Sequence, residues 1–351
     1  MNSQTLIAIL ALGSLLMACV PLEDGDPDPE ETDAFRAGLI SADDIAMDYE
    51  PASNTTARAL MNGDTEYSRL AISTGHAVAG TNHFLLEWVE LMEEVAAYPP
   101  SAAGDDYRMW QGPDGDVFYR ITVERTTEAD GTRFDFSLEG RHVDEDDDEL
   151  TTLFDGYGVR PDDASPGDRR GWGIIRHDFD AIDELHPEEE IGGQSAVAFR
   201  KYGGVHQVEV RLTEVTGPDH DGFVPGAAYG YVQFDDGSGT LDWLGYDDFE
   251  DQGQPYEQVS ARVEWDADKS GVGNAVITDG SLEVDYLEVG ECWNPIIQRI
   301  YGRIASPDGE FTSGDAQDCS IAEPADLTVP DDGALDEDEP AVPDEHPAEE
   351  S

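Results

Sequence analysis

The stretch DADKSGVGN carries oxygen-bearing side chains at the spacing of a calcium-binding loop. Four potential ligands fall at positions 1, 3, 5 and 9 of an EF-hand-like loop: Asp266, Asp268, Ser270 and Asn274. Gly271 occupies the sixth position, but Ile277 stands at the twelfth, where calcium needs a bidentate carboxylate, and Asp279 lies two residues too far along. Alternating apolar residues flank the stretch on both sides. We therefore expect a hairpin turn here rather than a calcium site.

A second group of potential metal ligands lies between residues 177 and 186. Its imidazoles and carboxylates suit zinc or another divalent ion: His177, Asp178, Asp180, Asp183, Glu184 and His186. Their spacing selects no metal, and in a chain this acidic some histidines fall beside carboxylates by chance, so we expect a solvated loop. His206, on a predicted strand, and His220, in the turn GPDHDG, give no stronger signal. No metal site is assigned.

Motifs for nucleophilic or phosphate chemistry are absent from the sequence. There is no G-x-S-x-G elbow, no H-E-x-x-H helix and no phosphate-cradling glycine-rich loop. A pair of facing carboxylates for glycoside cleavage cannot be selected, because acidic residues are so abundant. We assign no catalytic or cofactor-binding residue, and the sequence favours a non-enzymatic role.

The first residues have the pattern of an export signal. Residues 6–17 are almost all Leu, Ile and Ala, a run long enough for a signal peptide but too short to span a bilayer. The sequence Leu16-Met17-Ala18-Cys19 that follows resembles the lipobox of bacterial lipoproteins. This resemblance implies that the Cys19 thiol receives a diacylglyceryl group and that Cys19 becomes the acylated first residue after cleavage.

Two features depart from the lipobox pattern. Residues 1–5 contain no Lys or Arg, and Met17 stands where a smaller residue is commoner. The alternative is an ordinary secretory peptide cut near Ala18, which leaves Cys19 as a free or paired thiol. We favour lipidation of Cys19. The acyl chains would then hold the protein at a membrane of the cell envelope. Val20 after the cysteine favours the outer membrane, with the protein facing the periplasm or the surface.

Composition divides the chain into four parts. Residues 1–18 form the lipoprotein signal peptide, and residues 19–53 form an acidic, proline-rich tether with too little apolar content to fold alone. Residues 54–319 form a single domain, large enough to bury a real core. Residues 320–351 contain no Lys or Arg and repeat Asp, Glu and Pro, which predicts a disordered acidic tail.

The net charge limits the possible partners. The chain carries 79 acidic and 19 basic residues, a formal charge of −60. A field of this sign repels phosphate backbones and anionic lipid surfaces, so nucleic acid is excluded as a partner. It also collects divalent cations diffusely. Adaptation to a salty or divalent-rich milieu explains this charge without a dedicated acidic function.

Cys292 and Cys319 remain once Cys19 is set aside. In an oxidising envelope the default interpretation of such a pair is a disulfide, and closing a loop of this length stabilises the fold by about 3 kcal/mol in the chain-entropy model. The alternative, a two-cysteine metal site, lacks nearby histidines.

One amphipathic helix is predicted over residues 82–97. Apolar residues recur there every three or four positions, and glutamates occupy most of the opposite side. Thr81 or Asn82 can cap its start, and Pro99 ends it. Residues 65–78 are compatible with a helix too, but Gly75 and Gly80 argue against continuity.

After residue 100 the pattern changes to short alternating runs separated by Gly, Asp and Pro. Residues 118–124 and 133–138 flank the turn EADGT and predict a β-hairpin. Further strands are predicted at 171–178, 195–202, 205–215, 227–234, 239–245, 259–265, 272–278 and 282–289. Loops are expected at 142–150 and 183–190. The fold class is therefore mainly β (α+β): roughly nine to eleven strands in an antiparallel meander sheet, an open barrel or a sandwich, with one packed helix.

Several stretches together resemble a group of uncharacterised lipoproteins of Gram-negative bacteria. They are the lipobox, AYPP, MWQGP, VEWDADKSGVGNAVITDGSL, and VGECWN with the later Cys319. The resemblance implies an envelope location and supports the Cys292–Cys319 disulfide, but no activity. We expect a surface or interaction role. The first alternative is a carrier of an apolar small molecule in a cavity between sheet and helix, and the second is a carboxylate hydrolase. The oligomeric state is open.

Overall fold

The structure, a computed structural model, describes residues 29–49, 67–129, 131–146, 149–164, 169–187, 190–216, 224–247, 256–280 and 282–321. Cys19, the predicted signal peptide and residues 322–351 of the predicted tail lie outside these ranges. So does His220.

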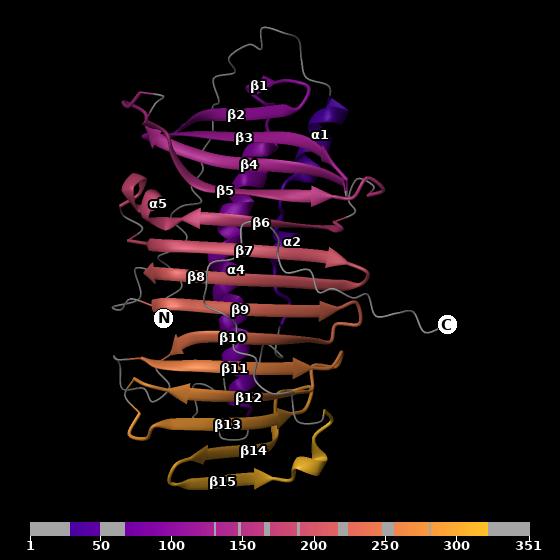
Figure 1. The fold of residues 1–351 in the computed structure, drawn as a ribbon, viewed down its shortest axis with the longest axis vertical. Coiled ribbons are helices and arrows are strands. Elements are labelled where there is room, and N and C mark those ends of the chain that lie inside the picture. The colour runs from indigo at the N-terminus through magenta and orange to yellow at the C-terminus, as the bar shows by residue number, and fades with distance from the viewer. Residues whose placement is uncertain are drawn as a thin grey trace.

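A single antiparallel sheet of fifteen strands dominates the described residues, and its spatial order follows the chain from β1 to β15 (Figure 1). The strands in its first half are β1 (Ala102–Ala103), β2 (Tyr107–Asp114), β3 (Val117–Glu128), β4 (Gly131–His142), β5 (Thr151–Arg160), β6 (Gly171–Asp178), β7 (Gly192–Tyr202) and β8 (Val205–Thr216). The second half contains β9 (Val224–Phe234), β10 (Gly239–Asp247), β11 (Glu257–Trp265), β12 (Gly271–Thr278), β13 (Tyr286–Trp293), β14 (Arg299–Ser306) and β15 (Gly309–Gly314).

The predicted mainly β meander is confirmed, and the strands form one sheet that does not close. The predicted hairpin is also confirmed, because β3 pairs with β4 and places Ile121 opposite Leu138 and Val123 opposite Phe136. The number of strands was predicted too low. The missed strands include β2, which contains Pro113, the glycine-containing β5, and the final hairpin of β14 and β15, so their alternation was weak or lay beyond the last predicted strand.

Within the described residues, four α-helices and one 3₁₀ helix accompany the sheet. They are α1 (Pro29–Gly38), α2 (Ala42–Ile45), α4 (Arg69–Ala96), α5 (Phe179–Leu185) and the 3₁₀ helix η3 (Ala316–Asp318). The short helix α5 occupies part of the loop expected at 183–190, which corrects that boundary. Among the described helices, none combines the length and apolar character needed to cross a bilayer.

Helix α4 runs across the strands behind the sheet in Figure 1. Its 28 residues span about 42 Å at 1.5 Å per residue. Its first turn lies against Glu291 of β13, and just after its last turn the Tyr98 carbonyl accepts a hydrogen bond from Trp110 of β2 at 2.8 Å. One helix thus braces most of the sheet from β2 to β13.

The predicted helix was correct in type and in its end, but its start was wrong. Ser68 caps α4, well before the predicted caps Thr81 and Asn82, and its side chain accepts a hydrogen bond from Ala71 N at 3.1 Å. Asn82 lies inside the helix, where its amide bonds the backbone of Met47 in both directions at 3.0 and 2.7 Å. The helix continues through Gly75 and Gly80 because residues such as Leu70 and Val78 pack into the core.

Residues 29–49, which composition assigned to the tether, belong to the folded body. They bury apolar side chains in the main core, including Phe35, Ile40 and Ile45. The prediction of a tether up to residue 53 is therefore wrong for this interval. The acidic residues that suggested it are concentrated up to Asp33, and the apolar side chains that follow, such as Phe35 and Ile40, are buried.

The core lies between one face of the sheet and the α-helices. On β11 the side chains of Val259, Ala261 and Val263 are buried there, while the alternate residues such as Ser260 and Arg262 point to the other face. On β8, which matches the strand predicted over 205–215, Val208 and Val210 are buried in the same alternating way. All four α-helices that the structure describes pack on this one side, so we call the opposite side, on which none of these α-helices packs, the uncovered face.

Candidate functional site: the uncovered face of the sheet

The calcium-like stretch is the turn between β11 and β12, as predicted. Asp268 Oδ1 accepts hydrogen bonds from Ser270 N at 2.9 Å and from Ser270 Oγ at 2.7 Å. Lys269 adopts a left-handed conformation with φ of 68°, and the Asp266 carbonyl accepts its backbone N–H at 2.8 Å. The Asp268 carboxylate is thus used to close the turn.

The prediction of a solvated loop is wrong for His177. This residue lies on β6 beneath α5, fully buried between the rings of Phe154 and Phe179, and its Nδ1 lies 2.8 Å from Ser195 Oγ. Burial lowers the pKa of His177 to about 3, so the imidazole is neutral at neutral pH. Because Ser195 is also buried, this Ser–His pair faces the core rather than a substrate.

The neighbouring acids of the same cluster serve local structure. Asp178 caps α5 by accepting a hydrogen bond from Ala181 N at 3.1 Å, and Asp180 accepts one from Gly193 N at 2.8 Å. His186 lies 2.5 Å from the hydroxyl of Tyr119. Within the ranges that the structure describes, no three His, Cys, Asp or Glu side chains converge as a metal site.

A buried ionic cluster holds α2 against the sheet, and sequence reasoning missed it. The Asp44 carboxylate contacts Arg160 Nη2 at 2.7 Å and also pairs with Arg169. Burial alone would raise the pKa of Asp44, but the two guanidinium groups outweigh it and keep this pKa below its usual value. His206 completes the contact, with its Nε2 2.7 Å from the Asp44 carbonyl oxygen. These residues fix the position of residues 29–49.

A second buried carboxylate holds the start of α4. Glu291 Oε2 accepts hydrogen bonds from Ser68 Oγ at 2.8 Å and from Leu70 N at 3.0 Å, and Arg299 Nη1 contacts Oε1 at 3.1 Å. A negative charge at a helix N-terminus is favourable, because the first N–H groups lack intrahelical acceptors. This carboxylate therefore anchors the bracing helix to β13.

The uncovered face carries a different chemistry, in which arginines alternate with the buried apolar residues of their strands. Five arginines on this face pair with acids on the same or a neighbouring strand: Arg133, Arg176, Arg211, Arg262 and Arg303. Arg262, for example, contacts Glu264 at 3.0 Å and Asp242 of β10 at 3.3 Å. Burial raises the pKa of Asp242, although Arg262 acts in the opposite direction. Partly exposed pairs of this kind contribute only about 0–1 kcal/mol each, so their main effect is to set the chemistry of the surface.

On β5 and β6 an apolar cluster lies among these arginine–acid pairs. Tyr157, Val159 and Ile174 are buried on the uncovered face, and Trp172 packs beside them, separate from the main core. The Arg133 guanidinium lies 3.8 Å from the centroid of the Tyr157 ring. The half-buried Trp172 is therefore the member of this cluster that stays partly accessible, and it lies among fixed hydrogen-bonding groups, a mixture that is typical of protein interaction surfaces.

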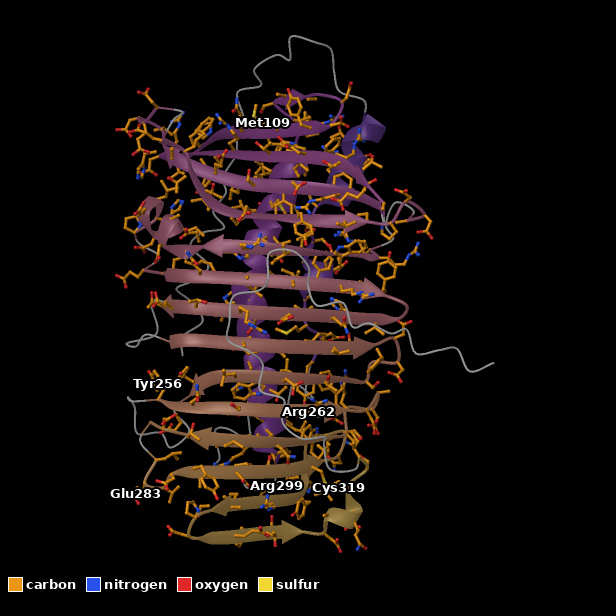
Figure 2. The ribbon with its side chains drawn as sticks, in the orientation of Figure 1. Met109, Tyr256, Arg262, Glu283, Arg299 and Cys319 are labelled. Carbon is orange, nitrogen blue, oxygen red and sulfur yellow. A yellow bond between two sulfur atoms is a disulfide. The ribbon has the colours of Figure 1, made fainter. Side chains whose placement is uncertain are left out.

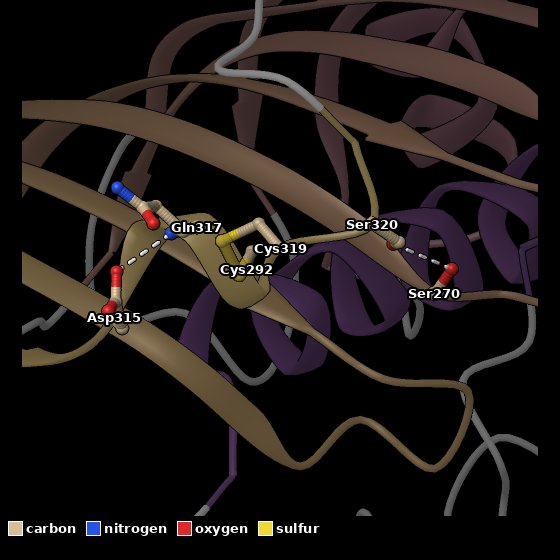
Figure 3. The surroundings of a disulfide bond; sticks show 6 residues. All are labelled: Ser270, Cys292, Asp315, Gln317, Cys319 and Ser320. Atoms are coloured by element: carbon tan, nitrogen blue, oxygen red, sulfur yellow. Dashed lines mark hydrogen bonds between the residues drawn. A yellow bond between two sulfur atoms is a disulfide. The ribbon is translucent and has the colours of Figure 1, made fainter.

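The disulfide between Cys292 and Cys319 is present, as predicted (Figure 3). Cys292 pairs with Val272 and Tyr301, so it lies on the uncovered face of β13. Near it, Ser320 Oγ lies 3.1 Å from Ser270 Oγ. In Figure 2 Cys319 and Met109 of β2 lie toward opposite ends of the sheet. Because it joins Cys319 to Cys292 of β13, the disulfide holds the chain after β15 against the last strands of the sheet.

Comparison with known proteins gives no family for this chain. No protein-family model, no curated protein and no solved structure matches it.

Sequence reasoning did not identify the uncovered face as a surface. The arginines and acids of these five pairs are spread over eight strands, and each is an ordinary polar residue of an alternating strand. The available signal was the distribution of the arginines, several of which occupy the polar positions of predicted strands in a chain with few basic residues.

Proposed function

We propose that this protein is a lipid-anchored component of the bacterial cell envelope with a non-enzymatic interaction role. Cys19 carries the anchor, and the outer membrane is the expected site. The lipobox and the envelope-type disulfide support this assignment. The resemblance to uncharacterised Gram-negative lipoproteins points the same way.

The one-sided arrangement of the described helices carries the interaction role. They cover one face of a fifteen-stranded sheet, and the other face presents paired charges around an apolar cluster of which the half-buried Trp172 is partly accessible. The paired arginines are held by their acids, so they offer N–H donors in fixed directions. A partner with complementary acceptors and one apolar contact fits this surface better than a small molecule does.

The packing between sheet and α4 gives little support to the carrier alternative. Leu85, Val89 and Met92 of α4 are fully buried there, and a ligand-sized cavity would leave accessible surface on the side chains that line it. For the hydrolase alternative, the acids named on the uncovered face are paired with arginines. Neither alternative has a specific observation in its favour.

Photo-crosslinking in the native envelope tests the interaction role. A photoreactive amino acid replaces Ser137 or Ser260, which lie on the uncovered face of β4 and β11. The matched control replaces Glu90, an exposed residue of α4 on the opposite side. We expect crosslinked species from Ser137 and Ser260 only. Crosslinks from Glu90 alone, or from none of the three, would contradict the role.

Metabolic labelling tests the anchor separately. Cells that express the full chain and receive an alkyne-tagged fatty acid should label the wild-type protein, and the Cys19→Ser variant should carry no label. Label on the variant, or none on the wild type, would contradict lipidation at this residue.

A further inference from the structure

The last two strands extend beyond the start of the bracing helix. The cap of α4 at Ser68 contacts Glu291 of β13, and β14 and β15 follow in the sheet order. Ile304 of β14 pairs with Val289 of β13 on the helix side of the sheet, and Phe311 of β15 pairs with Ile304. Val289 is 7% exposed, whereas Ile304 is 45% and Phe311 67% exposed. Apolar surface on the core side thus continues past the helix into solvent.

Strand β15 is also the end of the sheet. Within the described residues it pairs with β14 on one side and with no strand on the other. Natural edge strands are usually protected by charged side chains, proline or a bulge, because their free N–H and C=O groups can pair with another chain. The sequence GEFTSG of β15 contains no proline, no register shift occurs between β14 and β15, and its one charged side chain, Glu310, is already paired with Arg303.

The disulfide holds this edge in place. After β15 the chain turns through η3, where Asp315 Oδ1 accepts a hydrogen bond from Gln317 N at 3.0 Å, and Cys319 then joins Cys292 of β13 (Figure 3). An edge that is already ordered loses little conformational entropy when a partner strand adds to it. Strand β15 is therefore an ordered edge with which another strand can pair.

The charges around β15 indicate the kind of strand that it accepts. Carboxylates flank the strand and lie on it: Asp308, Glu310, Asp315 and Asp318. The nearby Arg303 already contacts Glu310 at 3.0 Å and Glu288 at 3.4 Å. A second copy of this chain, with its net charge of −60, would bring like charges together at this edge. A basic strand would meet opposite charges instead.

We propose that β15 accepts an extended basic segment of another protein as an additional strand of the sheet. Residues of β15 alternate, so Phe311 lies on the helix side while Glu310 and Thr312 lie on the uncovered face. The matching segment alternates too, with apolar side chains beside Phe311 and Lys or Arg beside Glu310. Main-chain hydrogen bonds supply affinity, and the side chains supply selectivity. This inference is independent of the uncovered face and of the lipid anchor.

A synthetic peptide of alternating Val and Lys, seven residues long with blocked ends, serves as the probe. Its binding to the full chain is measured by fluorescence anisotropy. We expect the Phe311→Asp and Glu310→Lys variants each to weaken binding about ten-fold or more. The control variant Phe234→Asp changes another exposed phenylalanine, on β9 inside the sheet order, and should alter affinity less than two-fold. Unchanged thermal unfolding of all three variants shows that the fold is retained.

Two altered peptides separate strand addition from attraction between charges. A peptide with Glu in place of Lys should not bind, and a Val–Lys peptide N-methylated at alternate residues, on the edge that faces β15, should lose at least ten-fold in affinity. Equal binding of the parent peptide and the N-methylated peptide would overturn the proposal. So would equal weakening by Phe234→Asp, or a dimer of the free protein that Phe311→Asp dissociates, because the edge would then be occupied by a second copy.

Discussion

At the scale of single residues, buried polar groups connect segments that are distant in sequence. Asp44 and Arg160 are 116 residues apart, and Ser68 and Glu291 are 223 apart. No periodic pattern links such residues, so sequence reasoning could not pair them. Local spacing was informative only where the partners are close, as in the Asp266–Ser270 turn.

The Asp44→Asn substitution should destabilise the protein strongly. It leaves the buried guanidinium of Arg160 without its charged partner, and breaking a buried pair in this way costs about 3–5 kcal/mol. The free energy of unfolding from urea titrations at pH 7 measures the loss. Asp43→Asn, at an exposed neighbour on the same helix, should change it by less than about 0.5 kcal/mol.

The pH dependence of the same variant follows from the lowered pKa of Asp44. Above pH 3.8, the pKa of Asp44 in the unfolded chain, the carboxylate stabilises the folded protein in full. This stabilisation is lost as the pH falls through the lower pKa that Asp44 has in the folded state. The difference between wild type and Asp44→Asn should therefore shrink below about pH 3.8. A difference that grows on acidification would contradict the ion pair.

His177 should make the protein less stable as the pH falls. Its pKa is about 3 in the folded state against 6.5 unfolded, so the unfolded chain binds the proton first. Between these values the free energy of unfolding should fall by up to about 1.4 kcal/mol per pH unit from this group. Urea titrations from pH 7 to pH 4 should show a shallower dependence for His177→Gln. The exposed control His76→Gln should follow the wild type, and parallel curves for all three proteins would rule out a buried neutral His177.

At the scale of elements, α4 and the strands differ in how far local sequence determined them. The β3–β4 hairpin was predictable because an Asp-Gly turn joins two alternating runs. The first half of α4 was not, because each interior glycine costs about 1 kcal/mol relative to alanine and only tertiary packing offsets that cost. Leu70, Ala71 and Ile72 supply this packing, and Glu291 supplies the N-terminal acceptor.

Ser68→Ala should weaken the start of α4. The substitution removes the cap to Ala71 N and the hydrogen bond to Glu291, so we expect a loss of about 1–2 kcal/mol in the free energy of unfolding. Hydrogen exchange should accelerate in the first turn of α4 and remain unchanged near Val95. Ser73→Ala, inside the helix, should not destabilise it. Equal effects of the two substitutions would show that Ser68 is not the cap.

At the scale of the whole molecule, the described residues form a long sheet with α-helices on one side, and residues 29–49 belong to that helical side. The alternation of strands predicted an antiparallel sheet. Its openness could not be predicted, since the same pattern fits a barrel, a sandwich or a single layer. Composition misplaced residues 29–49, because acidic residues near the start of this interval obscured the apolar ones that follow Asp33.

Truncation distinguishes the tether from the fold. A chain that begins at residue 29 should fold as stably as one that begins at residue 20. A chain that begins at residue 50 should fail to fold, because removing the buried Phe35, Ile40, Ile45, Met47 and Tyr49 forfeits on the order of 10 kcal/mol, comparable with the whole stability of a typical domain. Circular dichroism and urea titration compare the three chains, and a stable fold from residue 50 would show that the interval is dispensable.

Hydroxyl-radical footprinting tests the one-sided architecture and the role of the uncovered face together. In the purified protein, Trp172, Tyr246 and Tyr301 on the uncovered face should be oxidised readily, while Trp110, Trp265 and Trp293 in the core should be protected. In native envelopes the first set should become protected by the bound partner. Oxidation of both sets alike in the purified protein, or no change at the first set in envelopes, would contradict a sheet that keeps one face for partners.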